Sequence, residues 1–239
     1  MGGQGAGLDV RGGGGPVAGG RCVAARGAGT AGRGADRVIR VHDEGGLEGG
    51  LRLVVLDRAD KANALTAAML ADLAAAVETA EGFAALVVTG AGKVFSAGAD
   101  LQGMAEGLGD APEWGRLTAA LDGFRGLSVA ALNGTLAGGA FGMALACDLR
   151  VCVPGAEFFY PVMKRGYLPQ PSDPKRLAAL VGPSRARMIL LAGARIGAAE
   201  ALGWGLVDRV ADDALAAARA LCADALAAGA HGARIKALF

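Results

Sequence analysis

The sequence predicts one α/β domain with buried strands. Short runs of apolar residues alternate along the chain with segments that show the apolar spacing of helices. At least one run, residues 84–89, is continuously apolar up to its last residue, as in strands covered on both faces. The composition is 53% hydrophobic and only 5% aromatic, so mainly Ala, Leu and Val fill the core.

The predicted elements begin near residue 38. Strands are expected at 38–41 and 51–56, with a turn at 48–50 between them. Thr66 then caps a helix with one apolar stripe, formed by Met69, Leu70, Leu73 and Val77. Further strands are predicted at 84–89, 129–132, 149–153 and 206–210. Further helices are predicted from 139, at 174–181, 183–191 and 198–202, and from 212 to the end of the chain.

Residues 1–36 differ from the rest. They contain fourteen of the 41 glycines, and their few charges are mostly arginine. Such a segment buries too little apolar surface to offset the entropy of ordering it. We therefore expect a Gly/Arg-rich disordered tail at 1–36 and one domain at 37–239.

Charge and composition exclude several classes of function. A formal charge of +1 argues against nucleic-acid binding. Four cysteines without a CxxC pair, and only two histidines, indicate neither a metal site nor a redox pair. Residues 126–147 carry no charge, but their five glycines favour a strand, a loop and a buried helix over a membrane span. We expect a soluble, cytoplasmic protein.

Two glycine loops fail the tests for nucleotide binding. Residues 90–93 lack both the earlier glycine and the Ser or Thr of a phosphate-binding loop, and residues 134–142 do not fit GxGxxG. Instead, residues 95–101 and 136–142 follow strands and carry small side chains, which let a ligand approach the backbone N–H groups. Packing of the strand–helix junction is the more frequent reason for such glycines.

Several blocks in order resemble the enoyl-CoA hydratase/isomerase (crotonase) family. They are residues 56–65, 87–101, 133–150, 158–169 and 191–207, and the similarity extends over roughly residues 38 to 236. The resemblance implies a spiral of ββα units that binds an acyl-CoA thioester. It also implies a lyase or isomerase of fatty acid metabolism that needs no cofactor or metal beyond the coenzyme A of its substrate. A homotrimer or a dimer of trimers is the implied assembly.

The resemblance also assigns residues. By position, the backbone N–H groups of Ala97 and Gly139 are similar to the oxyanion hole of the family. The implied substrate- and CoA-binding residues are Lys61, Ala62, Ala97, Gly98, Ala99, Asp100, Leu101, Gly138, Gly139, Gly142 and Val162. Asp100 is expected to contact the adenine side or to serve the structure, and a turn-capping role is an open alternative.

The sequence departs from the family where the chemistry is done. Hydratases of the family use two glutamates, and the corresponding positions here are Gly142 and Val162. A positioned acid or base contributes about 10²–10⁴-fold to a rate, so ordinary hydration is not expected. That corner of the site is expected to be apolar. Non-catalytic binding or shuttling of acyl-CoA is therefore the alternative function.

Two residues could replace the lost carboxylates. Asp173 precedes Pro174 and either caps a helix or acts as a repositioned base. Tyr160 could donate a hydrogen bond into the site, whereas Glu157 is expected to face solvent. The chain also stops at Phe239, where family members usually continue, so a truncated C-terminal helical region is expected.

Overall fold

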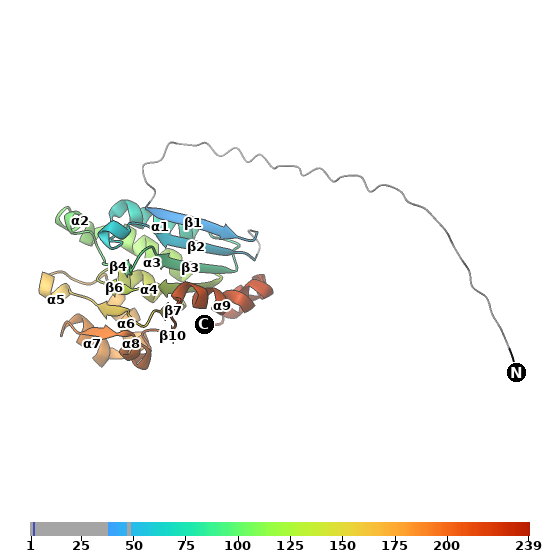
Figure 1. The fold of residues 1–239 in the computed structure, drawn as a ribbon. Coiled ribbons are helices and arrows are strands. Elements are labelled where there is room, and N and C mark those ends of the chain that lie inside the picture. Colours follow the sequence, from blue (N-terminus) through green and yellow to red (C-terminus); the bar gives the residue numbers. More distant parts are fainter. Residues whose placement is uncertain (1, 3–37, 47–48) are drawn as a thin grey trace. The chain divides into compact units, whose positions relative to one another are not determined.

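Two β-sheets and the helices around them make up the part of the chain that the computed structural model describes, residues 2, 38–46 and 49–239 (Figure 1). From residue 38 on, these residues belong to one unit. The predicted tail at 1–36 lies outside the described residues except for Gly2, and so does Glu48 of the predicted turn.

The larger sheet has six strands in the order β1-β2-β3-β5-β7-β10. Their bounds are Ile39–Glu44, Leu51–Leu56, Ala85–Gly90, Leu127–Leu132, Leu149–Cys152 and Arg209–Val210. β1 runs antiparallel to β2, and all other pairs in the sheet are parallel. The parallel strands therefore end at one edge of the sheet, and from β3, β5 and β7 the chain continues directly into the second sheet.

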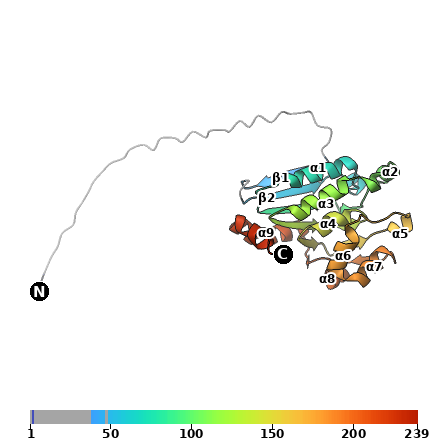
Figure 2. The same cartoon turned by 180° about the vertical axis from the view of Figure 1, so that it is seen from behind.

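Helices cover both faces of the larger sheet. α9 (Ala214–Ala228) lies on one face, and α1 (Ala67–Glu78), α3 (Glu113–Gly123) and α4 (Ala140–Ala146) lie on the other (Figures 1 and 2). All six residues of β2 are buried as a result. This two-sided cover is the physical reason why β2 and β3 are mostly apolar without alternation.

The smaller sheet contains β4 (Val94–Ser96), β6 (Thr135–Ala137), β8 (Glu157–Phe159) and β9 (Arg195–Gly197). β4, β6 and β8 each directly follow a strand of the larger sheet, and the chain then returns through helices. This repeat of two strands and a helix confirms the predicted crotonase-like spiral. β4, β6 and β8 run parallel, so their carboxyl ends meet at one place.

The predicted helices are present, with one correction. Thr66 caps α1 by accepting a hydrogen bond from the N–H of Met69, as predicted. The single terminal helix expected from residue 212 is wrong, because Gly229, with a positive φ, divides it into α9 and α10 (Ala230–Lys236). The other helices are α2 (Leu101–Ala105), α5 (Val162–Arg165), α6 (Asp173–Val181), α7 (Pro183–Leu190), α8 (Ala198–Trp204), and the 3-10 turns η1 (Ala59–Lys61) and η2 (Leu108–Asp110).

None of the helices in the described part of the chain combines the length and the apolar character that crossing a bilayer requires.

Candidate active site

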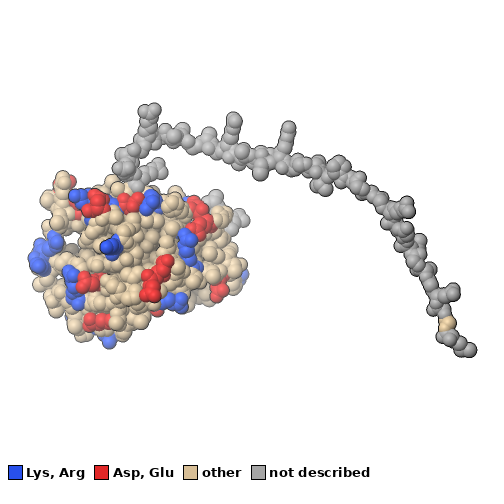
Figure 3. Space-filling model, in the orientation of Figure 1, with Lys and Arg blue, Asp and Glu red and all other residues tan. Residues whose placement is uncertain are grey.

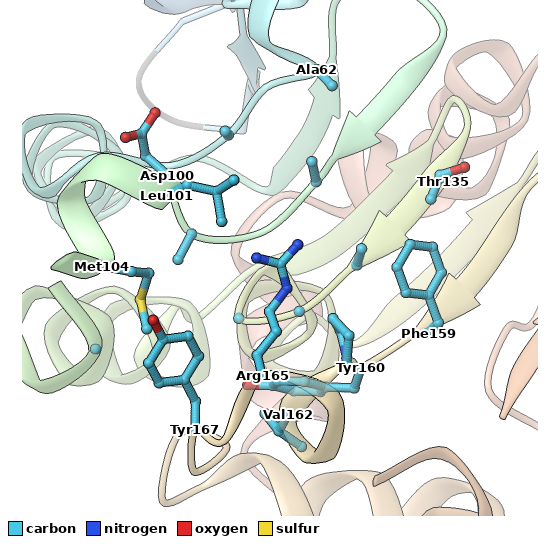
Figure 4. A pocket seen from close by; sticks show the side chains of 18 of the residues that line it. Ala62, Asp100, Leu101, Met104, Thr135, Phe159, Tyr160, Val162, Arg165 and Tyr167 are labelled. Carbon is cyan, nitrogen blue, oxygen red and sulfur yellow. The ribbon is translucent and has the colours of Figure 1, made fainter. Parts of the chain in front are cut away.

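A cavity of about 710 Å³ lies at the carboxyl ends of β4, β6 and β8, between α2 and α5 (Figure 4). Most of the residues that the sequence assigned to the site line it: Lys61, Ala62, Ala97, Ala99, Asp100, Leu101, Gly138, Gly139, Tyr160 and Val162. Gly98, Gly142 and Asp173 lie behind this lining. The strand ends thus bring together residues from segments far apart in the sequence.

Gly98 allows the two glycine loops to meet. A Cβ atom at this position would lie 2.7 Å from the carbonyl oxygen of Ala137 and 3.3 Å from the nitrogen of Gly139. Gly98 also has a φ of +90°, a conformation that other L residues rarely adopt. Both facts restrict the position to glycine, and its role is close approach rather than ligand contact.

Some backbone N–H groups at this junction donate a hydrogen bond within the protein, and others have no acceptor among the described residues. The N–H of Ala97 donates to the carbonyl oxygen of Ala62 at 2.9 Å. The N–H groups of Ala99 and Gly139, in contrast, have no acceptor among the described residues. The prediction that Ala97 supplies an oxyanion donor is therefore wrong, and Ala99, two residues later, presents the free donor.

The pairing of Leu65 with Ala99 explains which N–H is free. Leu65 donates to the carbonyl of Gly98 and accepts from the N–H of Asp100, which makes a parallel bridge. In such a bridge the residue between the two bonded groups directs its own N–H away from the partner strand. The N–H of Ala99 accordingly points away from Leu65, and Ala99 lines the cavity.

Asp100 has the structural role that the sequence left open. Its side chain caps α2 by accepting from the N–H groups of Gln102 and Gly103, and it pairs with Arg58 at 2.7 Å. The Arg58 hydrogen bond, followed by the backbone N–H of Gly103, lowers the pKa of the Asp100 carboxyl. The Asp100 carboxylate thus links Arg58 to the N-terminus of α2 at the cavity wall.

The loop that carries Lys61 and Ala62 is held by buried Asn63. Its side-chain amide donates to the carbonyls of Ala91 and Val94, and its oxygen accepts from the N–H of Arg58. Asn63 has a φ of +53°, which Asn tolerates better than most residues. These bonds fix Lys61 and Ala62 against the start of β4.

Tyr160 and Asp173 form a buried hydrogen-bonded pair. The Tyr160 hydroxyl donates to Asp173 Oδ2 at 2.9 Å, and the two residues are only 4% and 1% exposed. Burial raises the pKa of Asp173 to about 6, a shift that the Tyr160 hydrogen bond opposes. Burial, and then the charge of Asp173, raises the pKa of Tyr160. Tyr160 lines the cavity, and its hydroxyl donates to Asp173.

The corner beside Gly142 was predicted to be apolar, and this prediction is wrong, because the corner holds the Asp173 carboxylate. A Cβ on Gly142 would lie 2.8 Å from Asp173 Oδ1 and 3.3 Å from Thr118 Cγ2. The interpretation of Asp173 as a helix cap is also wrong, because Ser172 precedes the helix and Asp173 is its first residue, with the side chain turned inward. Gly142 consequently faces Asp173 and not the cavity.

Basic side chains surround the cavity. Arg58 and Arg195 are paired with Asp100 and Glu157, whereas Lys61 and Arg165 form no ion pair with the described residues. Figure 4 shows the Arg165 side chain extending from α5 into the cavity. The prediction that Glu157 faces solvent holds only in part, because Glu157 also lines the cavity. Across the face in Figure 3, basic and acidic side chains are interspersed.

Three cysteines, Cys147, Cys152 and Cys222, are buried and have unreactive thiols. Burial raises the pKa of Cys147 to about 12 and that of Cys152 and Cys222 to about 11. A thiol that stays protonated is a poor nucleophile. Within residues 38–46 and 49–239, no group of three or more His, Cys, Asp or Glu residues could hold a metal ion.

Sequence reasoning missed Ala99 as the free donor and Arg165 as a cavity residue. Ala99 lay inside the binding segment that the resemblance indicated, but the direction of its N–H depends on pairing with Leu65. Arg165 carries no motif, and only the position of α5 brings it to the cavity.

Comparison with known sequences identifies related proteins. A sequence model of the family described as enoyl-CoA hydratase/isomerase matches residues 46–238. The chain is 41% identical over 185 residues to a probable enoyl-CoA hydratase of Mycobacterium tuberculosis, which covers 74% of this chain and 72% of that protein. It is 39% identical over 138 residues to carnitinyl-CoA dehydratase of Escherichia coli, covering 54% and 51%.

Solved structures show the same fold. DspI of Pseudomonas aeruginosa matches with a TM-score of 0.76 and 31% identity over 86% of each chain. An enoyl-CoA hydratase subunit I from Geobacillus kaustophilus matches with a TM-score of 0.71 and 34% identity, covering 80% of this chain and 76% of that one. These similarities agree with the two-sheet spiral described above.

Proposed function

Because the chain belongs to the enoyl-CoA hydratase/isomerase family, we propose that its cavity binds an acyl-CoA thioester and polarises the thioester carbonyl. The free N–H groups of Ala99 and Gly139 would donate to the carbonyl oxygen. Their lack of any acceptor among the described residues, at the point where two strand ends converge, is the observation that carries the proposal.

Two such donors favour an enolate. When a base removes a proton from the α-carbon, negative charge moves to the thioester oxygen, and fixed N–H groups stabilise it without reorganisation. One donor of this kind is worth about 10²–10³-fold in rate. The site can therefore support α-proton chemistry even without a group that activates water.

The cavity offers separate surroundings for the two ends of such a ligand. Lys61 and Arg165 have no carboxylate partner among the described residues and can meet the phosphates of coenzyme A. Leu101, Met104 and Val162 give apolar surface for an acyl group. The guanidinium of Arg165 and the ammonium of Lys61 at the cavity wall would also accelerate capture of an anionic ligand.

Hydration is not part of the proposal. Gly142 carries no side chain and Val162 is apolar, so neither can bind and deprotonate a water molecule. These two residues favour the second candidate function, binding or shuttling of acyl-CoA without turnover. The homotrimer and the cytoplasmic location implied by the resemblance remain predictions, and sedimentation would test the first.

Calorimetry with butyryl-CoA and with free coenzyme A, run beside a crotonyl-CoA hydration assay, tests the proposal. We expect butyryl-CoA to bind more tightly than coenzyme A, because only the thioester engages the two amides. Hydration should stay close to the rate without protein. Equal affinity for the two ligands, or no binding of either, would overturn the proposal, and rapid hydration would show that an unidentified group activates water.

A further inference from the structure

The Asp173 carboxylate occupies the corner of the site that Gly142 leaves open. We propose that Tyr160 is the catalytic acid–base group of this site and that Asp173 is the positioning residue that accepts and returns its proton. This inference rests on the proposed function, because it needs an acyl-CoA whose carbonyl lies between the two amides. It differs from that function in assigning the proton transfer itself.

Two side chains among the described residues form hydrogen bonds with the Asp173 carboxylate, those of Tyr160 and Ser172. Of these two residues, only Tyr160 also lines the cavity. Its hydroxyl lies 2.9 Å from Asp173 Oδ2, whereas Asp173 does not line the cavity. The second hydrogen-bond partner, Ser172, contacts Oδ1 at 3.4 Å and does not line the cavity either. A proton that passes between Asp173 and a bound ligand therefore passes through the Tyr160 hydroxyl.

The position of Tyr160 suits this role. It follows β8, next to Pro161 and Val162, and its ring packs against Phe141 of α4 with centroids 5.4 Å apart. Figure 4 shows Tyr160 beside Val162 at the side of the cavity from which Arg165 rises. The N–H of Gln170 also approaches the Tyr160 oxygen, at 3.4 Å, so the hydroxyl is held from two sides.

The proton transfer balances without free phenolate. The α-carbon–hydrogen bond breaks, and its proton goes to Tyr160 Oη while the hydroxyl proton of Tyr160 moves to Asp173 Oδ2. The electron pair of the broken bond moves to the thioester oxygen, where the N–H groups of Ala99 and Gly139 stabilise it. The reverse transfer returns a proton to carbon and restores the Asp173 carboxylate.

The coupled transfer is needed because neither residue serves alone. The raised pKa of Tyr160 makes a phenolate next to an ionised Asp173 costly at neutral pH. Transfer through the hydroxyl instead makes Asp173 the net base. A general base works best when its pKa is close to the pH of the reaction, and the Asp173 pKa of about 6 is close to neutral pH.

Few other charges face this pair. From its own helix, Asp173 is approached by the Ser172 hydroxyl and the Arg176 guanidinium, which lowers its pKa only as the last of four causes. Arg176 also pairs with Asp122, on α3. α3 further contributes the methyl group of Thr118 beside Gly142. Burial therefore dominates the titration of Asp173, and its protonation state is free to respond to Tyr160.

Exchange of the α-protons of butyryl-CoA in D2O, followed by proton NMR, tests the inference. We expect the protein to catalyse exchange, with a rate that rises with pH through about 6 as Asp173 ionises. Tyr160→Phe should lower the exchange rate by about 10²–10⁴-fold, while the butyryl-CoA affinity from calorimetry changes little. Asp173→Asn should lower the rate and remove the rise near pH 6.

Tyr167→Phe is the matched control. It removes the same hydroxyl group from the other tyrosine of the chain, which is 44% exposed and also lines the cavity but forms no hydrogen bond with Asp173, so the rise of the exchange rate near pH 6 should persist. Unfolding curves and butyryl-CoA affinity identify any variant that fails to fold. The wild-type pH profile does not depend on the variants, and a rate that is flat between pH 5 and 8 would contradict the role of Asp173.

The outcomes separate the two proposals. If wild-type protein does not bind butyryl-CoA, both are overturned. If it binds but does not exchange α-protons, or if Tyr160→Phe exchanges as fast as wild type, only the Tyr160–Asp173 assignment falls. Binding without exchange would leave the non-catalytic alternative in place.

Discussion

Asp173 Oδ1 lies 2.8 Å from the point that a Cβ atom on Gly142 would occupy. The buried carboxylate on α6 and the bare backbone of α4 therefore fit together, and neither position tolerates a larger group without a change in the other. This contact places a carboxylate in the corner from which the sequence had appeared to remove one, although it reaches the corner from a different helix.

Gly142→Ala should destabilise the protein through this contact. The new methyl group meets Asp173 Oδ1 at 2.8 Å and Thr118 Cγ2 at 3.3 Å, in a core that has no room to relax freely. We expect a loss of about 1–3 kcal/mol in the free energy of unfolding, measured by urea denaturation.

The matched control is Gly115→Ala, at an exposed position of α3, where a Cβ meets nothing within 4 Å. There the better helix propensity of Ala should raise stability by up to about 1 kcal/mol. In an Asp173→Ala background, Gly142→Ala should cost less than it does alone. Strictly additive losses would show that the two positions do not interact.

Asp173 should make stability depend on pH in the unusual direction for an aspartate. Its pKa is about 6 in the folded protein and 3.8 in the reference state, so the folded state holds its proton more tightly. The ionised carboxylate costs stability above pH 6, and this cost disappears as the pH falls below 3.8. The difference of about two pKa units corresponds to about 3 kcal/mol.

Asp173→Asn removes this titration. Compared with the variant, wild-type protein should gain stability as the pH is lowered from 7.5 to 4.5, as measured by urea denaturation at each pH. If the two proteins lose stability in parallel over this range, the raised pKa of Asp173 is wrong.

Gly98→Ala should separate the two free amides. A methyl group there lies 2.7 Å from the Ala137 carbonyl oxygen and 3.3 Å from the Gly139 nitrogen, and the φ of +90° adds strain. With butyryl-CoA labelled with ¹³C at its carbonyl, infrared spectra of wild-type protein should show the C=O stretch shifted to lower frequency. Gly98→Ala should weaken that shift and the binding.

Gly182→Ala is the control for backbone strain alone. Gly182 has a φ of +82°, but a Cβ there meets nothing within 4 Å, and it does not line the cavity. Its carbonyl shift should equal that of wild type. An undiminished shift in Gly98→Ala would mean that the convergence of the two loops is not required for polarisation.

Arg150 should be a major source of stability away from the cavity. This buried side chain donates to the carbonyls of Leu206 and Cys147 and pairs with Asp208, so it joins β7 to the segment before β10. Arg150→Met leaves carbonyl groups without a donor, each at a cost of about 1–3 kcal/mol. We expect a loss of at least about 2 kcal/mol in urea denaturation.

Arg219→Met provides the comparison on the surface. Arg219 pairs with Glu44, and both side chains are more than two-fifths exposed. Exposed pairs of this kind contribute about 0–1 kcal/mol. Equal losses in the two variants would contradict the assignment of the Arg150 contacts as structural.

Local patterns were sufficient to predict most of the larger sheet and, of the helices that cover it, α1, α4 and the start of α9, but not α3. The run at 51–56 and the stripe from Met69 to Val77 each depend on neighbours within a few residues, so sequence reasoning located β2 and α1 closely. The three-residue strands β4, β6, β8 and β9 carry no comparable periodicity. Their existence follows from how successive turns of the spiral stack.

The sequence by itself determined most strands of the larger sheet and several helices, the family, and the absence of side-chain carboxylates at 142 and 162, because residue identity and local spacing encode these properties. Only the tertiary structure decided which amide is free and where a carboxylate reappears. The direction of the Ala99 N–H depends on pairing with Leu65, and the position of Asp173 depends on the packing of α6 against α4. Both are contacts between segments distant along the chain, which no local pattern specifies.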